Sequence, residues 1–113
     1  MSNNLNSVIV EGLIRGESIE KTTPNYACFS VEVKREYKID GEIITEVSVF
    51  DIEAFGKLAE SVKKYLDNGA KVRVVGRLTQ KVYELSDGKR RAKVIIIAEH
   101  IELAQKIKEG KND

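Results

Sequence analysis

The first half of the chain alternates apolar and polar residues with a period of two, which is typical of β-strands with one buried face. The alternation is clearest over residues 27–34, whose apolar positions are Ala27, Phe29, Val31 and Val33. An earlier strand is predicted over residues 8–14, where Gly12 indicates a bulge or a bend. Residues 21–25 are predicted to form a loop, because Pro24 has no backbone donor for a strand ladder.

Turn residues delimit the remaining predicted strands. The Asp-Gly pair at residues 40–41 is a strong hairpin signal, and a β-rich segment follows it over residues 42–54. A second hairpin turn, Ser-Asp-Gly at residues 86–88, separates two further predicted strands over residues 71–83 and 89–101. The sequence therefore predicts two long β-hairpins.

The period changes to that of an α-helix between the third and fourth predicted strands. Residues 57–66 form one helical stripe whose apolar members are Leu58, Val62, Tyr65 and Leu66. Asn68 and Gly69 follow as a C-terminal stop. The charged segment from Glu102 onward shows only a weak helical pattern.

The order of three strands, a helix and two strands is that of the oligonucleotide-binding (OB) fold. A length of 113 residues suits one domain with a single modest core. We therefore predict an all-β domain with one short helix over residues 5–103, folded as a five-stranded OB barrel with long β-hairpin arms. Residues 104–113 are predicted to be a short charged tail.

The net charge of +1 conceals an uneven distribution along the chain. Between Lys71 and Lys93 there are eight basic and two acidic residues, which gives +6 and leaves −5 for the rest of the chain. In the strand over residues 71–83, the odd positions form a basic face ending in Tyr83, and the even positions form an apolar face. The alternation continues after the turn at Lys89, Arg91 and Lys93. This hairpin is predicted to project a basic arm that binds a polyanion.

A single nucleic-acid strand requires cations for its phosphates and exposed rings for its bases. Counterion release by Lys and Arg is independent of sequence, and stacking a base on an aromatic side chain contributes about 1–3 kcal/mol. Tyr37 follows Lys34 and Arg35, and Phe55 precedes Lys57. The candidate stacking rings are Tyr37, Phe55 and Tyr83. The alternative is a solvated basic face whose rings pack at the rim of the domain.

Other functional classes have less support in the sequence. Cys28 is the only cysteine, so it cannot form an internal disulfide. His100 is the only histidine, and one cysteine with one histidine makes a poor metal site. We expect Cys28 to be a packed thiol and His100 to be structural or at the surface. A nuclease would need a carboxylate cluster around a metal, and only Asp51 and Glu53 form an acid pair near the candidate rings. We therefore predict a protein that is not an enzyme and needs no cofactor.

The sequence also bears on location. No segment approaches the roughly 18 consecutive apolar residues of a membrane span. The polar N-terminus lacks the basic and apolar regions of a signal peptide. We expect a cytoplasmic protein, associated with the nucleoid and without a membrane partner.

Four sequence blocks give a more specific indication. They are NSVIVEG at residues 6–12, AFGKLAE at 54–60, YLDNG at 65–69 and VRVVGRL at 72–78. In this order and at these separations they resemble blocks of the bacterial single-stranded DNA-binding protein family, over residues 5–103. The resemblance implies an OB-fold that assembles as a homotetramer and is wrapped by single-stranded DNA. It also implies protection of that DNA during replication, recombination and repair.

The resemblance places the family's stacking aromatics at Tyr37, Phe55 and Tyr83. A further family aromatic corresponds to Val49, and the adjacent Phe50 points to the opposite face of its strand. Asp51 and Asp67 stand where some members carry basic residues, which argues against phosphate contacts at these two positions. Together, the arm and the resemblance give the basic residues expected along the DNA path: Lys34, Arg35, Lys57, Arg73, Arg77, Lys81, Lys89, Arg91 and Lys93.

The chain departs from the family pattern at its end. It stops at Asp113 without the Gly/Pro/Gln-rich linker and acidic tip of typical members, so recruitment of replication and repair proteins is not implied. The main alternative function is an OB domain for structured RNA or for protein assembly, such as a primosomal relative of the same family.

Overall fold

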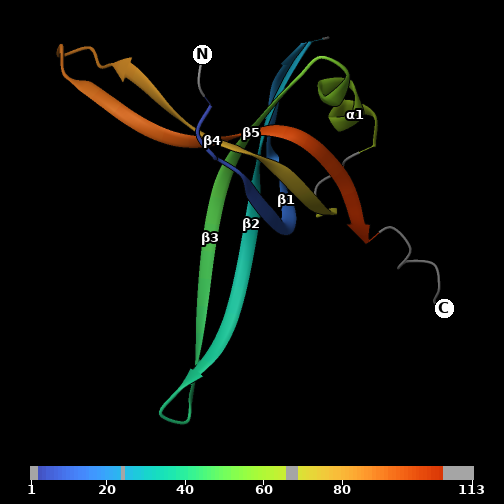
Figure 1. Ribbon diagram of the computed structural model, residues 1–113, viewed down its shortest axis with the longest axis vertical. Coiled ribbons are helices and arrows are strands. Elements are labelled where there is room, and N and C mark those ends of the chain that lie inside the picture. Colours follow the sequence, from blue (N-terminus) through green and yellow to red (C-terminus); the bar gives the residue numbers. More distant parts are fainter. Residues whose placement is uncertain (1–2, 24, 66–68, 106–113) are drawn as a thin grey trace.

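A computed structural model describes residues 3–23, 25–65 and 69–105 of the chain. The elements follow in the order β1 (Val8–Thr23), β2 (Tyr26–Ile39), β3 (Glu42–Phe55), α1 (Lys57–Tyr65), β4 (Lys71–Glu84) and β5 (Arg90–Gln105), as Figure 1 shows. The strands form a closed barrel in the spatial order β1-β2-β3-β5-β4. The predicted element order and the OB barrel are confirmed.

The barrel closes through one short parallel contact. β3 and β5 pair in parallel at Ile52↔Ile96 and Glu53↔Ile97, whereas all other neighbouring strands are antiparallel. The helix α1 packs against β1, β2, β3 and β5 at one end of the barrel (Figure 1). No helix among the described residues has the length and apolar character to cross a membrane.

Two hairpins extend from the barrel in different directions (Figure 1). We call them the β2–β3 arm, residues 34–47, and the β4–β5 arm, residues 77–94. The first turns at Asp40 and Gly41, whose φ values of 51° and 82° suit the tight primed turns of β-hairpins. The second turns over residues 85–89, where the Leu85 N–H donates to the Lys89 carbonyl at 2.7 Å. Both predicted hairpins are confirmed.

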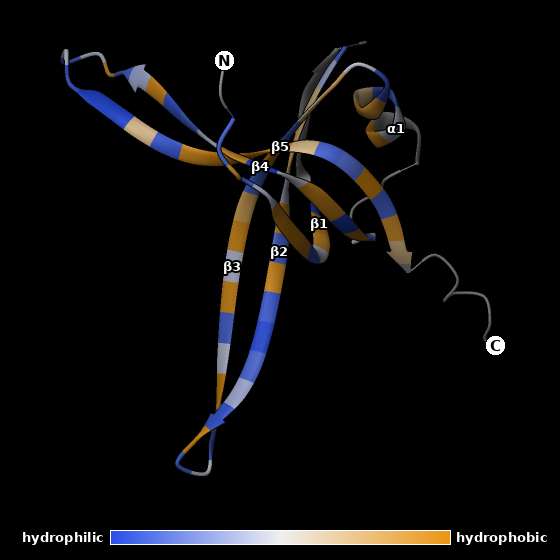
Figure 2. Ribbon diagram, viewed as in Figure 1, coloured by the Kyte–Doolittle hydropathy of each residue, from blue (hydrophilic) through white to orange (hydrophobic). Residues whose placement is uncertain are grey.

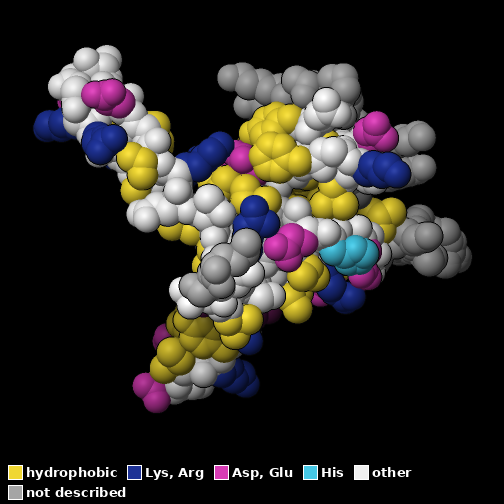
Figure 3. Space-filling model, turned by 45° about the horizontal axis from the view of Figure 1, so that its top comes forward, with side chains coloured by type: hydrophobic (Ala, Val, Ile, Leu, Met, Phe, Trp, Pro, Cys, Tyr) yellow, Lys and Arg dark blue, Asp and Glu magenta, His cyan; other side chains and the backbone are white. Residues whose placement is uncertain are grey.

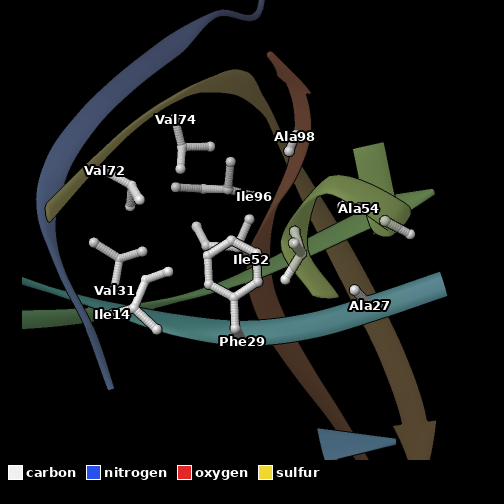
Figure 4. Packing of buried hydrophobic residues seen from close by; sticks show 12 residues of the cluster. Ile14, Ala27, Phe29, Val31, Ile52, Ala54, Val72, Val74, Ile96 and Ala98 are labelled. Carbon is white, nitrogen blue, oxygen red and sulfur yellow. The ribbon is translucent and has the colours of Figure 1, made fainter. Parts of the chain in front are cut away.

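The core lies inside the barrel and receives side chains from every strand (Figure 4). Besides Val62 of α1, its large members are the strand residues Ile14, Phe29, Val31, Ile52, Val72, Val74 and Ile96. They occupy alternate positions in β2 and in the first half of β4, as the period-two pattern predicts. Burying one such side chain contributes about 1.5–3 kcal/mol relative to leaving it exposed. The core therefore stabilises the barrel, while the arms extend beyond it.

Gly12 lies where β1 passes from β4 to β2. A Cβ at this position would lie 2.1 Å from the Glu32 carbonyl oxygen, so glycine permits a close approach of two backbones. The predicted bulge at Gly12 is wrong, because β1 pairs in regular register with β4 there. The pairing of β1 with β2 shifts register further along, between Arg15 and Glu20 and again between Glu20 and Thr23. β1 does bend strongly along its length (Figure 1).

Two element boundaries differ from the sequence prediction. β1 continues through Thr23, so residues 21–23 are strand rather than loop. β5 continues through Gln105, so residues 102–105 pair with β4 instead of being weakly helical. In both places a hydrogen-bonded neighbouring strand outweighs local sequence preference. α1 ends at Tyr65, and the expected stop at Asn68 lies outside the described residues.

Candidate nucleic-acid interface

β2 and β3 present one side to solvent and the other to the core. We call the solvent side the outward face, and it consists of Tyr26, Cys28, Ser30, Glu32, Val49, Asp51, Glu53 and Phe55. The two strands pair so that Tyr26 lies opposite Phe55, and Glu32 lies opposite Val49. Phe50 leaves β3 on the core side, opposite the buried Val31. The outward face thus includes one candidate ring and the position of the absent aromatic.

Phe55 is a large aromatic side chain that remains 52% exposed. Tyr26 packs against it, with ring centroids 5.4 Å apart and ring planes inclined by 53°. Burial raises the pKa of the Tyr26 phenol, and the neighbouring Cys28 thiol and Glu53 carboxylate raise it further. Tyr26 therefore keeps its proton and supports the Phe55 ring from one side.

Tyr26 was not among the residues predicted from the sequence, although the sequence contains the signal. The register of β2 and β3 is unbroken from the turn at Asp40 and Gly41 back to the Tyr26↔Phe55 pair. Counting outward from that turn places Tyr26 beside Phe55. The strand register measured from the turn is therefore the signal that identifies the second ring.

Two ion pairs connect the β4–β5 arm to the outward face. Lys81 Nζ lies 2.5 Å from Glu53 Oε2, and Lys93 Nζ lies 2.5 Å from Asp51 Oδ2. Ser30 Oγ also donates to Asp51 Oδ1 at 2.8 Å. The hydrogen bond from Lys93 lowers the pKa of Asp51, and the same bond raises the pKa of Lys93. Lys81 and Lys93, which were both predicted to bind phosphate, thus each contact a carboxylate of the protein itself.

The two arginines of β4 are paired as well. Arg73 contacts Glu11 of β1 at 3.0 Å and Glu102 of β5 at 3.4 Å. Arg77 contacts Glu99 of β5 at 3.2 Å. All five side chains are well exposed, and such ion pairs contribute about 0–1 kcal/mol. The predicted basic face of β4 therefore carries matched acids from neighbouring strands.

Other candidate cations, on β2, at the start of α1 and near the end of the β4–β5 arm, have no salt bridge within the described residues. Within the described ranges, no salt bridge is found for Lys34, Arg35, Lys57, Lys89 or Arg91. Arg91 lies directly across the β4–β5 ladder from Tyr83, which is 47% exposed. In Figure 3, Lys and Arg side chains lie toward the end of this arm together with acidic ones. The structure thus brings a candidate ring and an unpaired cation together near the end of the β4–β5 arm.

The β2–β3 arm carries Tyr37, which is exposed and lies opposite Ile44. By alternation Tyr37 leaves β2 on the side of the core residue Val31, whereas Tyr26 leaves it on the other side. The structure therefore does not bring Tyr37 to the outward face beside Phe55. Figure 2 shows β2 as mostly hydrophilic toward the turn and β3 as more hydrophobic. The exposed apolar side chains of this arm are Ile39, Ile43 and Val47.

The remaining candidates have simple surroundings. Lys57 begins α1, and Lys34 lines a pocket with Glu32 at the junction of β1, β2 and β4. Cys28 is partly buried, and its thiol lies beside the Tyr26 phenol. His100 is exposed and lies 3.0 Å from Glu102. In the described part of the chain, no three His, Cys, Asp or Glu side chains gather as metal ligands. Asp67 lies outside that part.

Comparison with known proteins places this barrel in a family. The model of the single-strand binding protein family matches residues 5–104. The single-stranded DNA-binding protein of Aquifex aeolicus (strain VF5) is 35% identical over 108 residues, covering 92% of this chain and 73% of that protein. The corresponding protein of Treponema pallidum (strain Nichols) is 34% identical over 103 residues, covering 88% of this chain and 58% of that protein.

A solved structure has the same fold. The Plasmodium falciparum SSB complex with ssDNA matches with a TM-score of 0.78 at 19% identity, and the match covers 93% of this chain and 99% of that chain. Sequence and fold thus agree over nearly the whole barrel, from the start of β1 to residue 104 near the end of β5. The chain belongs to the single-strand binding protein family.

Proposed function

We propose that this protein binds single-stranded DNA without sequence preference and protects it during replication, recombination and repair. The observation that carries the proposal is Phe55, a half-exposed ring supported by Tyr26 on the outward face of an OB barrel. Large aromatic side chains are normally buried. A supported and exposed ring offers a flat surface on which any base can stack.

The proposed binding combines rings with unpaired cations. Tyr83 offers a further ring on the β4–β5 arm, and Tyr37 offers a separate one on the other side of the β2–β3 arm; each stacked base contributes about 1–3 kcal/mol. Arg91, Lys89 and Lys34 supply positive charge for phosphates. Lysine and arginine contacts to phosphate do not distinguish bases, which supports binding that tolerates any sequence.

We propose that Asp51 and Glu53 do not form a catalytic centre. Each carboxylate contacts a lysine ammonium, and such pairing favours a charge-balanced binding surface over a metal-dependent nuclease. We also propose that the protein acts in the cytoplasm, on the DNA of the nucleoid. Recruitment of other proteins forms no part of the proposal.

We also propose that the protein assembles as a homotetramer. β1 leaves Ile9 64% and Leu13 47% exposed, whereas Val8 and Val10 of the same strand pack against the core. A second copy would remove these apolar side chains from water. Sedimentation of the protein at micromolar concentration is expected to give a tetramer, and a stable monomer would refute this part of the proposal.

The binding proposal is tested by comparing three ligands of equal length. The chain has four tyrosines and no tryptophan, so quenching of tyrosine fluorescence reports contact with bases. Titrations with oligo(dT), duplex DNA and single-stranded RNA are expected to show the tightest binding for oligo(dT). Equal or tighter binding of RNA or duplex would favour the alternative function, an OB domain for structured RNA. Failure to bind any of the three would favour a role in protein assembly.

A further inference from the structure

We infer that Asp51 is an internal competitor of DNA phosphate, which holds Lys93 in the free protein and releases it when a single strand binds. The inference rests on the proposed function and adds a way in which the protein limits its own affinity. It makes Asp51 a residue that sets both the strength and the salt dependence of binding.

The position of the pair supports this role. Asp51 lies on the outward face two residues from Val49, and Lys93 reaches it from the β4–β5 arm at 2.5 Å. The side chains are 30% and 52% exposed, so an incoming phosphate has access to the ammonium group. The lowered pKa of Asp51 and the raised pKa of Lys93 keep both groups charged at neutral pH. The ammonium therefore exchanges one anion for another.

Comparison with the neighbouring Lys81–Glu53 pair shows why only Lys93 leaves its carboxylate for a phosphate. The Glu53 side chain is 7% exposed, so removing Lys81 from it would leave a buried charge without its partner. Asp51 is more exposed and keeps the hydrogen bond from Ser30 Oγ at 2.8 Å. Water and Ser30 together satisfy Asp51 after Lys93 leaves. Lys81 thus stays with Glu53, whereas Lys93 is available to DNA.

The exchange has a measurable consequence for salt dependence. Each phosphate contact of a single strand contributes about −0.7 to the logarithmic salt slope. A lysine that must first leave a carboxylate gains less from this contact than a lysine that starts in water. Removing the competing carboxylate should therefore strengthen binding and steepen the slope.

The test replaces Asp51 by its neutral isostere. Asp51→Asn is expected to bind oligo(dT) about two- to fivefold more tightly, the range of an exposed ion pair. Its salt slope should be steeper by up to about 0.7. Glu42→Gln is the matched control, because Glu42 lies on the same strand, is exposed, and forms no salt bridge within the described residues. The control should bind much as the wild type does.

A second background separates the specific exchange from a general charge effect. In Lys93→Gln protein, Asp51→Asn should no longer tighten binding, because the cation that it releases is absent. A gain that persists in that background, or that Glu42→Gln matches, would overturn the inference. If the wild type binds oligo(dT) and Asp51→Asn binds it no more tightly, the inference is overturned but the proposed function stands. A wild type that binds no oligo(dT) would overturn the proposed function and the inference together.

Discussion

The two arms of this barrel use charge in opposite ways. On the β4–β5 arm, Arg77, Lys81 and Lys93 each contact an acid from another strand. On the β2–β3 arm, Lys34 and Arg35 have no salt bridge within the described residues, and exposed apolar side chains lie on the paired strand. The β4–β5 arm has twice as many basic residues, yet among the described residues each arm has three without a salt bridge: Lys89, Arg90 and Arg91 on the one, and Lys34, Arg35 and Lys38 on the other.

This contrast shows what a count of charges omits. Whether a lysine binds phosphate depends on which strand lies beside it, because an adjacent carboxylate already satisfies the ammonium group. Asp51 and Glu53 lie about thirty to forty residues before their lysine partners in the chain. The net charge of +6 between Lys71 and Lys93 thus overstates the positive charge that has no acidic partner in the described structure.

The largest expected effect concerns the rings of the two arms and the barrel. Tyr37→Ala, Phe55→Ala and Tyr83→Ala should each weaken binding of oligo(dT) by about 1–3 kcal/mol, because each removes one stacking surface. Fluorescence or calorimetric titration measures the change, with circular dichroism as a check on folding. The tyrosine variants are the cleaner test, since Phe55 also packs against Tyr26. Unchanged affinity in both tyrosine variants would contradict the stacking proposal.

A second prediction separates a structural lysine from a solvent-exposed one on the same arm. Lys81→Ala should lower the free energy of unfolding by about 1–3 kcal/mol, because it leaves the buried Glu53 carboxylate without its cation. Lys89→Ala should change it by less than about 0.5 kcal/mol. Urea denaturation of both variants measures the difference. Equal stabilities would mean that the Lys81–Glu53 pair does not hold the arm to the barrel.

A third prediction concerns the position at the base of the β2–β3 arm that lacks an aromatic. Val49 is exposed on the outward face, so Val49→Trp should add a stacking surface and tighten binding by about 1 kcal/mol. The new tryptophan also provides a fluorescence signal that DNA should quench. A folded Val49→Trp protein that binds no better than the wild type would show that the DNA path avoids this position.

The smallest effect concerns the pH dependence of stability. Lys93 lowers the pKa of Asp51 below 3.8, so this pair stabilises the fold above that pH and the contribution is lost as the pH falls through the lowered value. At pH 7, Asp51→Asn should be less stable than the wild type by about 0.2–1 kcal/mol, the range of an exposed pair. Thermal unfolding at several pH values should show the two proteins converging at low pH. A constant difference down to pH 2 would exclude the ion pair as its cause.

Most of the fold follows from local sequence signals. The Asp-Gly turn, the alternation in β2 and the helical stripe after Phe55 predicted the strands, the helix and the OB barrel, which the structure confirms. The end of β5 was missed, because Leu103 belongs to a strand only through its pairing with Val72. Local periodicity contains no information about a partner strand.

The candidate site was less accessible from the sequence for the same reason. Alternation correctly placed Val49 and Phe50 on opposite sides of β3. It did not show that Glu99 lies beside Arg77, or that Asp51 lies beside Lys93. These contacts depend on how the barrel closes, through β3 against β5 and β5 against β4.

The central claim is that cations with an internal carboxylate partner contribute less to DNA binding than cations without one. Arg91→Gln and Arg77→Gln test it most directly, because both change one arginine of the β4–β5 arm and only Arg77 contacts an acid among the described residues. The measurement is a salt titration of each variant with oligo(dT) and a mixed-sequence oligonucleotide. Arg91→Gln should make the logarithmic slope shallower by about 0.7, and Arg77→Gln by clearly less, with equal effects on both oligonucleotides. Equal slope changes in the two variants, or a loss confined to one oligonucleotide, would contradict the claim.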